Sequence, residues 1–221
     1  MRKSFRILFS LVLVFSTAGA LSAATVGTIP SGATNEFMGY FTGPEIAGLY
    51  GATLYLFAGG PTNIQIDFYG AEAGFKNWFK FNDELLFTHP GGGTNIAPGV
   101  NSPLASLTRT ANPGMLNFEF FVNNGAGSVA NGANPDDSNG QASGPNFFIS
   151  FNPWLNSAQN VPWGGQVAWI FLDDGGAGPD DNHDDFLVRL SIVQGEFRVP
   201  EPATLFLIGL GLLGLVGLRR K

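Results

Sequence analysis

The sequence has no cysteine and only two histidines among its 221 residues. The absence of cysteine excludes disulfides, thiolate metal sites, iron–sulfur clusters and thiol catalysis. A hydrolytic triad needs a positioned histidine as its base, so only His89 and His183 could serve one. His89 lies in a glycine-rich turn and His183 in an acidic loop, so we expect both at the surface. We therefore assign no catalytic residue.

Basic side chains are scarce between the two ends of the chain. Residues 25–198 contain 16 acidic and five basic residues, which gives a formal charge of −11. This excess of negative charge argues against nucleic acid or anionic lipid as a partner. It favours divalent cations.

The N-terminal residues have the three parts of a signal peptide. Basic residues at positions 2, 3 and 6 precede an apolar segment, Ile7–Phe15, and small residues then accumulate at 18–20 and 22–24. This order is typical of a segment removed by signal peptidase. We predict a signal peptide over residues 1–24, cut near Ala23 or Ala24, and hence an exported protein.

The C-terminal residues form a second three-part signal. Pro200-Glu201-Pro202 interrupts regular structure, Ala203–Leu218 is apolar throughout, and residues 219–221 are all basic. The apolar run predicts a helix in the cytoplasmic membrane with its basic end inside. Sixteen helical residues span about 24 Å, less than the roughly 30 Å of the hydrocarbon core. Such a short span suits temporary retention of the protein in the membrane.

This tail resembles the PEP-CTERM sorting signal of exported bacterial proteins, with Val199, Pro200, Glu201 and Pro202 as the sorting and processing motif. The resemblance implies recognition and cleavage by the membrane protease exosortase. It also implies a protein held on the extracytoplasmic face of the membrane, then found at the cell surface or in the extracellular matrix, in association with exopolysaccharide or biofilm. A plain tail anchor with an accidental Pro-Glu-Pro is the alternative.

The chain thus divides into residues 1–24, a domain over 25–198 and the sorting signal over 199–221. Within the domain, Ile64, Ile66 and Phe68 alternate with polar residues, and so do the apolar residues from Leu116 to Val122. Gln166–Leu172 is almost wholly apolar, as in a strand covered on both faces. Glycine- and proline-rich turns separate these segments. We predict an all-β, antiparallel β-sandwich of about eight strands, jelly-roll-like, with residues 125–144 as a surface loop or poorly ordered.

One loop could carry chemistry, because six of the domain's acids fall within residues 173–185. Like charges this close repel unless a cation offsets them, and Ca²⁺ takes six to eight oxygen ligands. The loop lacks the glycine and closing glutamate of an EF-hand. The alternative is a solvated loop whose aspartates cap turns. The candidate calcium ligands are Asp173, Asp174, Asp180, Asn182 and Asp184.

The leading hypothesis is a non-enzymatic surface or matrix protein. The first alternative is a carbohydrate-binding module for extracellular polysaccharide, with Trp154 and Trp163 as candidate stacking rings on a loop. The same rings could instead plug the open end of the sandwich. The second alternative is a secreted glycan hydrolase built on a pair of carboxylates, although the sequence selects no pair.

Overall fold

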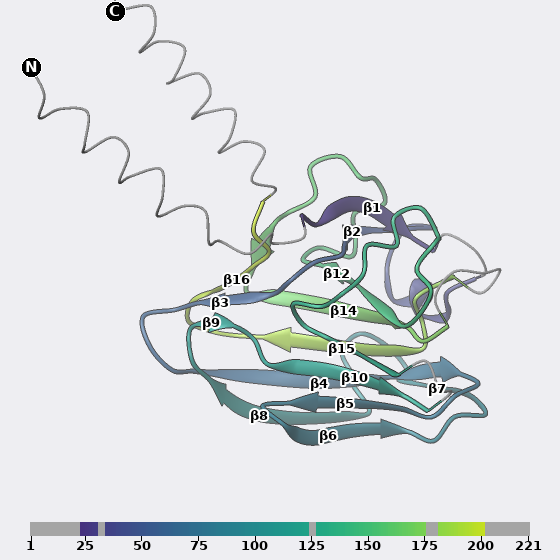
Figure 1. The fold of residues 1–221 in the computed structure, drawn as a ribbon, viewed down its shortest axis with the longest axis horizontal. Helices are drawn as coiled ribbons and strands as arrows, with labels where there is room; N and C mark the ends of the chain where they lie inside the picture. The colour runs from purple at the N-terminus through teal and green to yellow at the C-terminus, as the bar shows by residue number, and fades with distance from the viewer. Residues whose placement is uncertain (1–22, 31–33, 124–126, 176–180, 202–221) are drawn as a thin grey trace, which may run out of the picture.

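The computed structural model describes residues 23–30, 34–123, 127–175 and 181–201, which form three antiparallel β-sheets (Figure 1). The largest sheet contains, in spatial order, β1 (Thr25–Ile29), β2 (Ile46–Tyr50), β12 (Asn146–Ser150), β14 (Val167–Asp173), β15 (Phe186–Ser191), β4 (Thr62–Ala73) and β7 (Gly93–Ile96), with β8 (Ala105–Ala111) also paired to β4. The second sheet contains β11 (Gly127–Ala130), β10 (Phe118–Val122), β5 (Asn77–Phe81) and β6 (Glu84–His89). The third contains β13 (Gly164–Gly165), β16 (Glu196–Arg198), β3 (Tyr55–Phe57) and β9 (Gly114–Met115).

The second sheet packs on one face of the largest sheet through phenylalanine side chains. The ring of Phe118 on β10 lies 5.4 Å from that of Phe147 on β12, and the ring of Phe120 lies 5.8 Å from that of Phe186 on β15. Both β10 residues are buried, as the alternation from Leu116 to Val122 predicts. The two sheets therefore enclose one core, and the arrangement is sandwich-like.

The other face of the largest sheet is also covered, in this case by a short 3₁₀ helix, η2 (Glu36–Tyr40), and the residues after it. Phe41 makes an edge contact with Trp169 of β14, with 5.4 Å between ring centroids, and it also contacts Phe171. Ile170 and Leu172 of the same strand point into the opposite core. This burial on both faces confirms the strand predicted at 166–172 and makes Trp169 a core residue.

A buried ion pair joins the middle strands of the largest sheet. Asp67 of β4 is fully buried, and Arg189 of β15 donates two hydrogen bonds to its Oδ2, at 3.0 and 2.7 Å. Ser106 and Gln65 donate to Oδ1 at 2.6 and 2.9 Å. The guanidinium also lies over the ring of Trp169, 5.2 Å from its centroid. Both oxygens of this carboxylate are therefore satisfied.

The predicted all-β, antiparallel class is confirmed, and the strands on either side of residues 173–185 pair with each other. The described residues form sixteen strands rather than about eight. The difference comes from strands such as β9 and β13, which have two residues each and therefore show no alternation in the sequence. The jelly-roll connectivity stays a prediction.

The prediction of a surface loop at residues 125–144 is wrong for 127–130, which form a strand, and is partly confirmed for 131–144, which contain no strand and are mostly exposed. This segment contributes β11 to the second sheet, and three of its polar side chains are buried. Asn131 bonds to the backbone of Leu54 and Leu116, and Asn134 bonds to the N–H and carbonyl of Phe147. These amides replace the hydrogen bonds that a sheet would supply, so the segment is fixed without long strands.

The ends of the chain are less fully described. The predicted signal peptide, apart from Ala23 and Ala24, lies outside the described residues, as do Pro202 and the predicted C-terminal helix at 203–218. Among the residues that the structure does describe, no helix is long and apolar enough to cross a membrane.

Candidate metal centre

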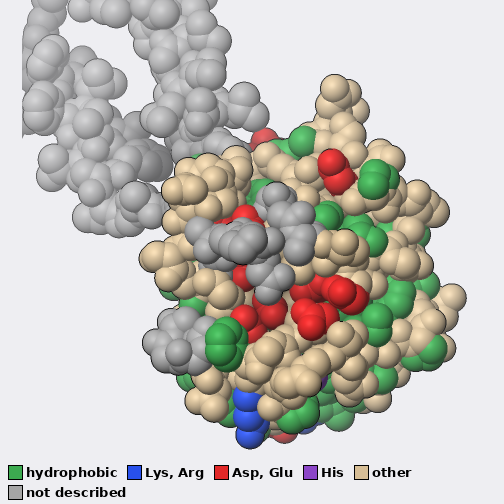
Figure 2. Space-filling view, turned by 90° about the vertical axis from the view of Figure 1, so that its right-hand side faces the viewer, with side chains coloured by type: hydrophobic (Ala, Val, Ile, Leu, Met, Phe, Trp, Pro, Cys, Tyr) green, Lys and Arg blue, Asp and Glu red, His purple; other side chains and the backbone are tan. Residues whose placement is uncertain are grey.

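The loop between β14 and β15 is buried at one end of the sandwich. We call Asp173, Asp174, Asp181, Asp184 and Asp185 the acidic cluster, and each of these residues is at most 8% exposed. Acidic side chains gather in a hollow on this end of the molecule (Figure 2). Neighbouring segments cover the described part of 173–185 apart from Gly175, so the prediction of a solvated loop is wrong there. The predicted turn capping is confirmed at Asp173, whose Oδ1 accepts a hydrogen bond from Gly175 N–H.

Burying so many carboxylates is costly unless their charge is offset or they are protonated. The five basic side chains of the sandwich have other contacts. Arg189 pairs with Asp67, Arg109 with Glu84 and Arg198 with Glu196, while Lys76 lies over the ring of Trp78 and Lys80 over that of Phe121. None of these contacts involves the acidic cluster, and His183 is a basic residue that lies beside it, with Nδ1 3.4 Å from Asp181 Oδ1. A bound cation is one way to balance ionised carboxylates here.

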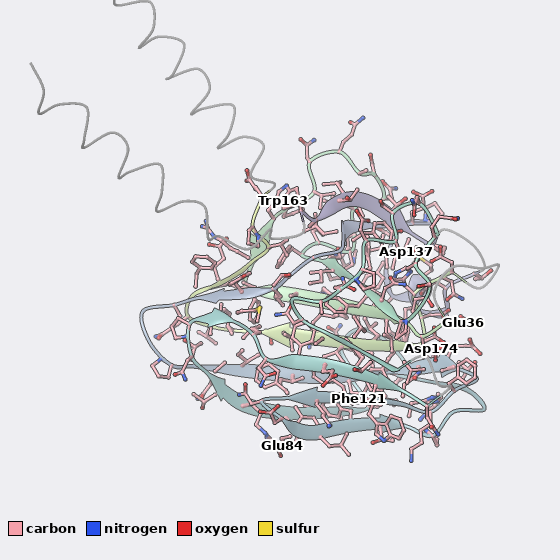
Figure 3. All side chains as sticks on the ribbon, viewed as in Figure 1. Glu36, Glu84, Phe121, Asp137, Trp163 and Asp174 are labelled. Carbon is pink, nitrogen blue, oxygen red and sulfur yellow. The ribbon has the colours of Figure 1, made fainter. Side chains whose placement is uncertain are left out.

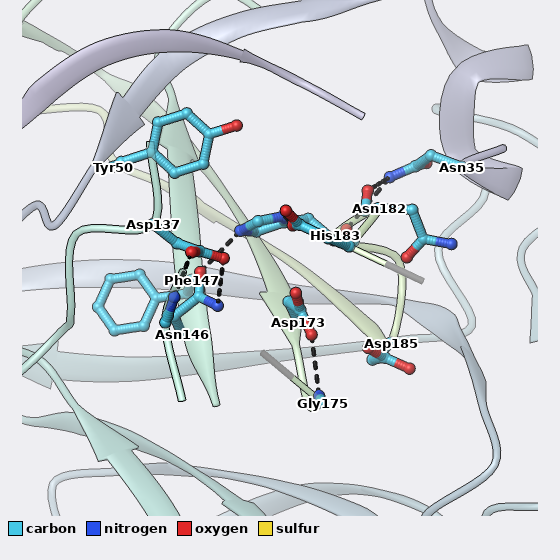
Figure 4. Close-up of polar contacts among 12 residues, drawn as sticks. Asn35, Tyr50, Asp137, Asn146, Phe147, Asp173, Gly175, Asn182, His183 and Asp185 are labelled. Atoms are coloured by element: carbon cyan, nitrogen blue, oxygen red, sulfur yellow. Dashed lines mark hydrogen bonds and ion pairs between the residues drawn. The ribbon is translucent and has the colours of Figure 1, made fainter. Parts of the chain in front are cut away.

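The first group of possible ligands is Asp173, Asp181 and His183. One ligand atom from each lies within 4.8 Å of the other two, and all three side chains are buried. His183 has a positive φ of 60°, and its buried ring makes edge contacts with the rings of Tyr50 and Phe148. Gly175 donates a backbone hydrogen bond of 2.8 Å to Asp173 Oδ1 (Figure 4). This group offers one nitrogen and two carboxylates.

The second group is Glu36, Glu72 and Asp184, again with ligand atoms within 4.8 Å of one another. It joins three elements, because Glu36 N–H donates to Asp184 Oδ2 at 3.2 Å and Glu72 N–H donates to the Asp184 carbonyl at 3.0 Å. Asp184 Oδ1 is buried and has no hydrogen-bond partner among the described residues. This group offers oxygen only.

Two carboxyls of the cluster have strongly raised pKa values. Burial raises the pKa of Asp184 to about 9, and a hydrogen bond with the side chain of Glu36 adds to the rise, whereas the bond from the Glu36 N–H lowers it. Burial also raises the pKa of Asp185 to about 10, with the negative charge of Asp174 as the next cause. Without a cation the protonated forms are favoured at neutral pH, so metal and protons compete for this region.

The structure separates the predicted calcium ligands. Asp173 belongs to the first group and Asp184 to the second. Asp174 accepts a hydrogen bond of 2.6 Å from Asn77, and Asn182 donates one of 3.1 Å to the Thr34 carbonyl. Asp180 lies outside the described residues. Sequence reasoning missed Glu36, Glu72, Asp137 and Asn146, which come from distant segments with no local motif.

The prediction of surface positions for both histidines is wrong. His183 is fully buried, and His89 is 2% exposed at the end of β6. His89 Nδ1 accepts a hydrogen bond of 3.3 Å from Gly91 N–H, and burial lowers its pKa. The glycine-rich turn after His89 thus folds back over the ring instead of exposing it.

The two candidate sugar-stacking tryptophans differ in exposure. Trp154 is 46% exposed, and its ring makes edge contacts with Phe41 and Trp169. Trp163 is half-buried and packs against the core, as expected of a ring that plugs the sandwich. Trp154 is therefore the better placed of the two for a ligand.

The sorting motif begins directly after the last strand. Val199 is buried, and its N–H donates a hydrogen bond of 2.9 Å to the Trp163 carbonyl. Pro200 and Glu201 line a groove together with Phe57 and Trp163. Trp163 lies away from Glu36 and Asp174, which mark the acidic end of the sandwich (Figure 3).

A family model described as the PEP-CTERM protein-sorting motif matches residues 198–221. The chain carries a PEP-CTERM sorting signal. The resemblance based on Val199–Pro202 is thereby confirmed. A PEP-CTERM signal implies an exported protein that is sorted to the cell surface and processed by an exosortase. No curated protein and no solved structure matches the chain. The PEP-CTERM match covers the tail alone, so it assigns no activity to the sandwich.

Proposed function

We propose that this protein is a non-enzymatic component of the cell surface or extracellular matrix, released or transferred when exosortase cuts at Pro200-Glu201-Pro202. The observation that carries the proposal is the sorting signal directly after a complete sandwich. A folded domain followed by a cleavable tail is the arrangement expected of a protein that exosortase sorts and processes. In support of a non-enzymatic role, both histidines take part in buried structural contacts.

The first prediction tests this processing. Pro202→Ala should leave the chain membrane-bound at full length, whereas the unaltered chain should be released without its apolar run. Intact mass spectrometry of the membrane and released fractions measures both. Pro61→Ala is the control, because Pro61 lies in an exposed turn outside the motif. Released protein that still carries residues 205–221 would contradict the proposal.

We also propose that Ca²⁺ binds at the acidic end, at Glu36, Glu72 and Asp184. These residues supply oxygen ligands only, as hard cations prefer. The buried Asp184 Oδ1, with no hydrogen-bond partner within the described chain, offers a ligand atom that folding has already desolvated. Three segments meet at this group, so a bound ion would link η2, β4 and the start of β15.

Association with extracellular polysaccharide is a further part of the proposal, supported by the half-exposed ring of Trp154. We expect Trp154→Ala to weaken retention on polysaccharide from the producing cells, because the apolar faces of sugar rings stack on exposed aromatic rings. Affinity electrophoresis in gels containing that polysaccharide measures the effect. Phe57→Ala is the control, since Phe57 is an exposed ring at 54% on a different element. Equal mobility of the Trp154→Ala variant and the unaltered protein would argue against the carbohydrate role.

A further inference from the structure

The imidazole of His183 is oriented by a buried amide and a buried carboxylate (Figure 4). His183 Nε2 lies 2.8 Å from Asn146 Oδ1, and Asn146 Nδ2 donates to Asp137 Oδ2 at 3.3 Å. Because a carboxylate only accepts, the amide nitrogen must face Asp137 and the amide oxygen must face the ring. The proton of the neutral imidazole is therefore on Nε2.

This arrangement leaves a lone pair on Nδ1 of His183. The position of the ring places that lone pair near the carboxylates of Asp173 and Asp181. Nδ1 is buried, has no hydrogen-bond partner among the described residues, and lies 3.4 Å from Asp181 Oδ1. A charge-assisted hydrogen bond would be shorter, at about 2.7–2.9 Å. Two ligand atoms bound about 2.1 Å from one tetrahedral metal ion stand about 3.4 Å apart. The 3.4 Å between His183 Nδ1 and Asp181 Oδ1 therefore fits two ligands of one metal ion better than a direct hydrogen bond between them.

We propose that Asp173, Asp181 and His183 bind a divalent transition-metal ion of the zinc class. Imidazole nitrogen suits such ions, whereas Ca²⁺ prefers oxygen, so this site differs in chemistry from the one at Glu36, Glu72 and Asp184. Asn146 and Asp137 are positioning residues. Histidines that bind metals commonly donate their second ring N–H to an amide or carboxylate, which fixes the tautomer.

The competing arrangement is a protonated His183 paired with an ionised Asp181. It would place protons on both ring nitrogens and would need no metal. The two arrangements therefore differ in the protonation of one atom, Nδ1, and that atom can be observed directly.

The experiment is a zinc titration of the ¹⁵N-labelled full-length chain in detergent, followed by long-range ¹H–¹⁵N correlation of the histidine rings. The chain has two histidines, so His89 serves as an internal control. Zinc should shift the Nδ1 resonance of His183, leave its Nε2 protonated and leave His89 unchanged, while calcium should not move Nδ1. A His183 ring that is doubly protonated without metal and insensitive to zinc would overturn the proposal.

Variants separate ligands from positioning residues. Asp181→Asn should abolish the zinc-induced shift, and Asp137→Asn should weaken zinc binding by about 10- to 100-fold while Nδ1 still responds. Glu36→Gln, in the oxygen-only group, should leave the zinc response unchanged. An Asp181→Asn chain that binds zinc as tightly as the unaltered chain would contradict the assignment. If that variant fails to fold, the titration of the unaltered chain still decides.

Discussion

With divalent cations removed, the protein should lose stability steeply as the pH rises from 5 to 9. The pKa values of Asp184 and Asp185 are about 9 and about 10 in the folded chain, well above those of an unfolded chain. The folded state therefore binds more protons than the unfolded state over this range. Each such group lowers the free energy of unfolding by up to about 1.4 kcal/mol per pH unit. Urea unfolding in chelator at several pH values measures the slope.

Calcium should reverse much of this loss, because a bound cation stabilises the ionised carboxylates. At a hundredfold excess over its dissociation constant, one bound ion adds about 2.7 kcal/mol. The Asp184→Asn variant should respond little to calcium and should show a shallower pH slope in chelator. Glu84→Gln is the control, since Glu84 is an exposed acid paired with Arg109. Identical unfolding of the unaltered chain in calcium and in chelator across this pH range would contradict the calcium site.

Replacing Arg189 by Met should destabilise the sandwich by about 3–5 kcal/mol, because it leaves the buried carboxylate of Asp67 without its counter-charge. Unfolding in urea at fixed pH and fixed calcium measures the change. Adding Asp67→Asn should recover most of the loss, because the uncompensated charge is then gone.

Arg109→Met is the matched control for this pair. Arg109 forms its ion pair with Glu84 at the surface, where such pairs contribute little to stability. If Arg189→Met cost no more than Arg109→Met, the Asp67 pair would not have the stabilising role that its burial indicates.

The features of the fold that repeat locally could be predicted from the sequence. The apolar alternation from Leu116 to Val122 and the continuous run at 166–172 each reflect which faces a strand buries, so they predict β10 and β14 correctly. Two-residue strands such as β13 depend on pairing with a distant strand, here β16. No local pattern encodes such a pairing.

The candidate metal centre was predictable only in part, for the same reason. The density of aspartates at 173–185 identifies the loop, but the division into two ligand groups depends on residues far away in the chain. Glu36 reaches Asp184 across 148 positions, and Asn146 reaches His183 across 37. Burial of His183 could not be inferred from acidic neighbours, because Tyr50 and Phe148 cover it from other strands.

Trp163, whose carbonyl accepts a hydrogen bond from Val199, lies away from Asp174 of the acidic cluster (Figure 3), so a membrane-held form of the sandwich would have an inner and an outer end. Val199 is held by the sandwich, so only Pro200–Pro202 connect it to the apolar run, a reach of about 10 Å. In the proposed membrane-held form, the β16 side would lie against the cell and the acidic end would face the surroundings. Calcium sites of extracellular modules have dissociation constants of about 10⁻⁴–10⁻³ M. The occupancy of a site with that affinity would change with the Ca²⁺ concentration of the water outside the cell.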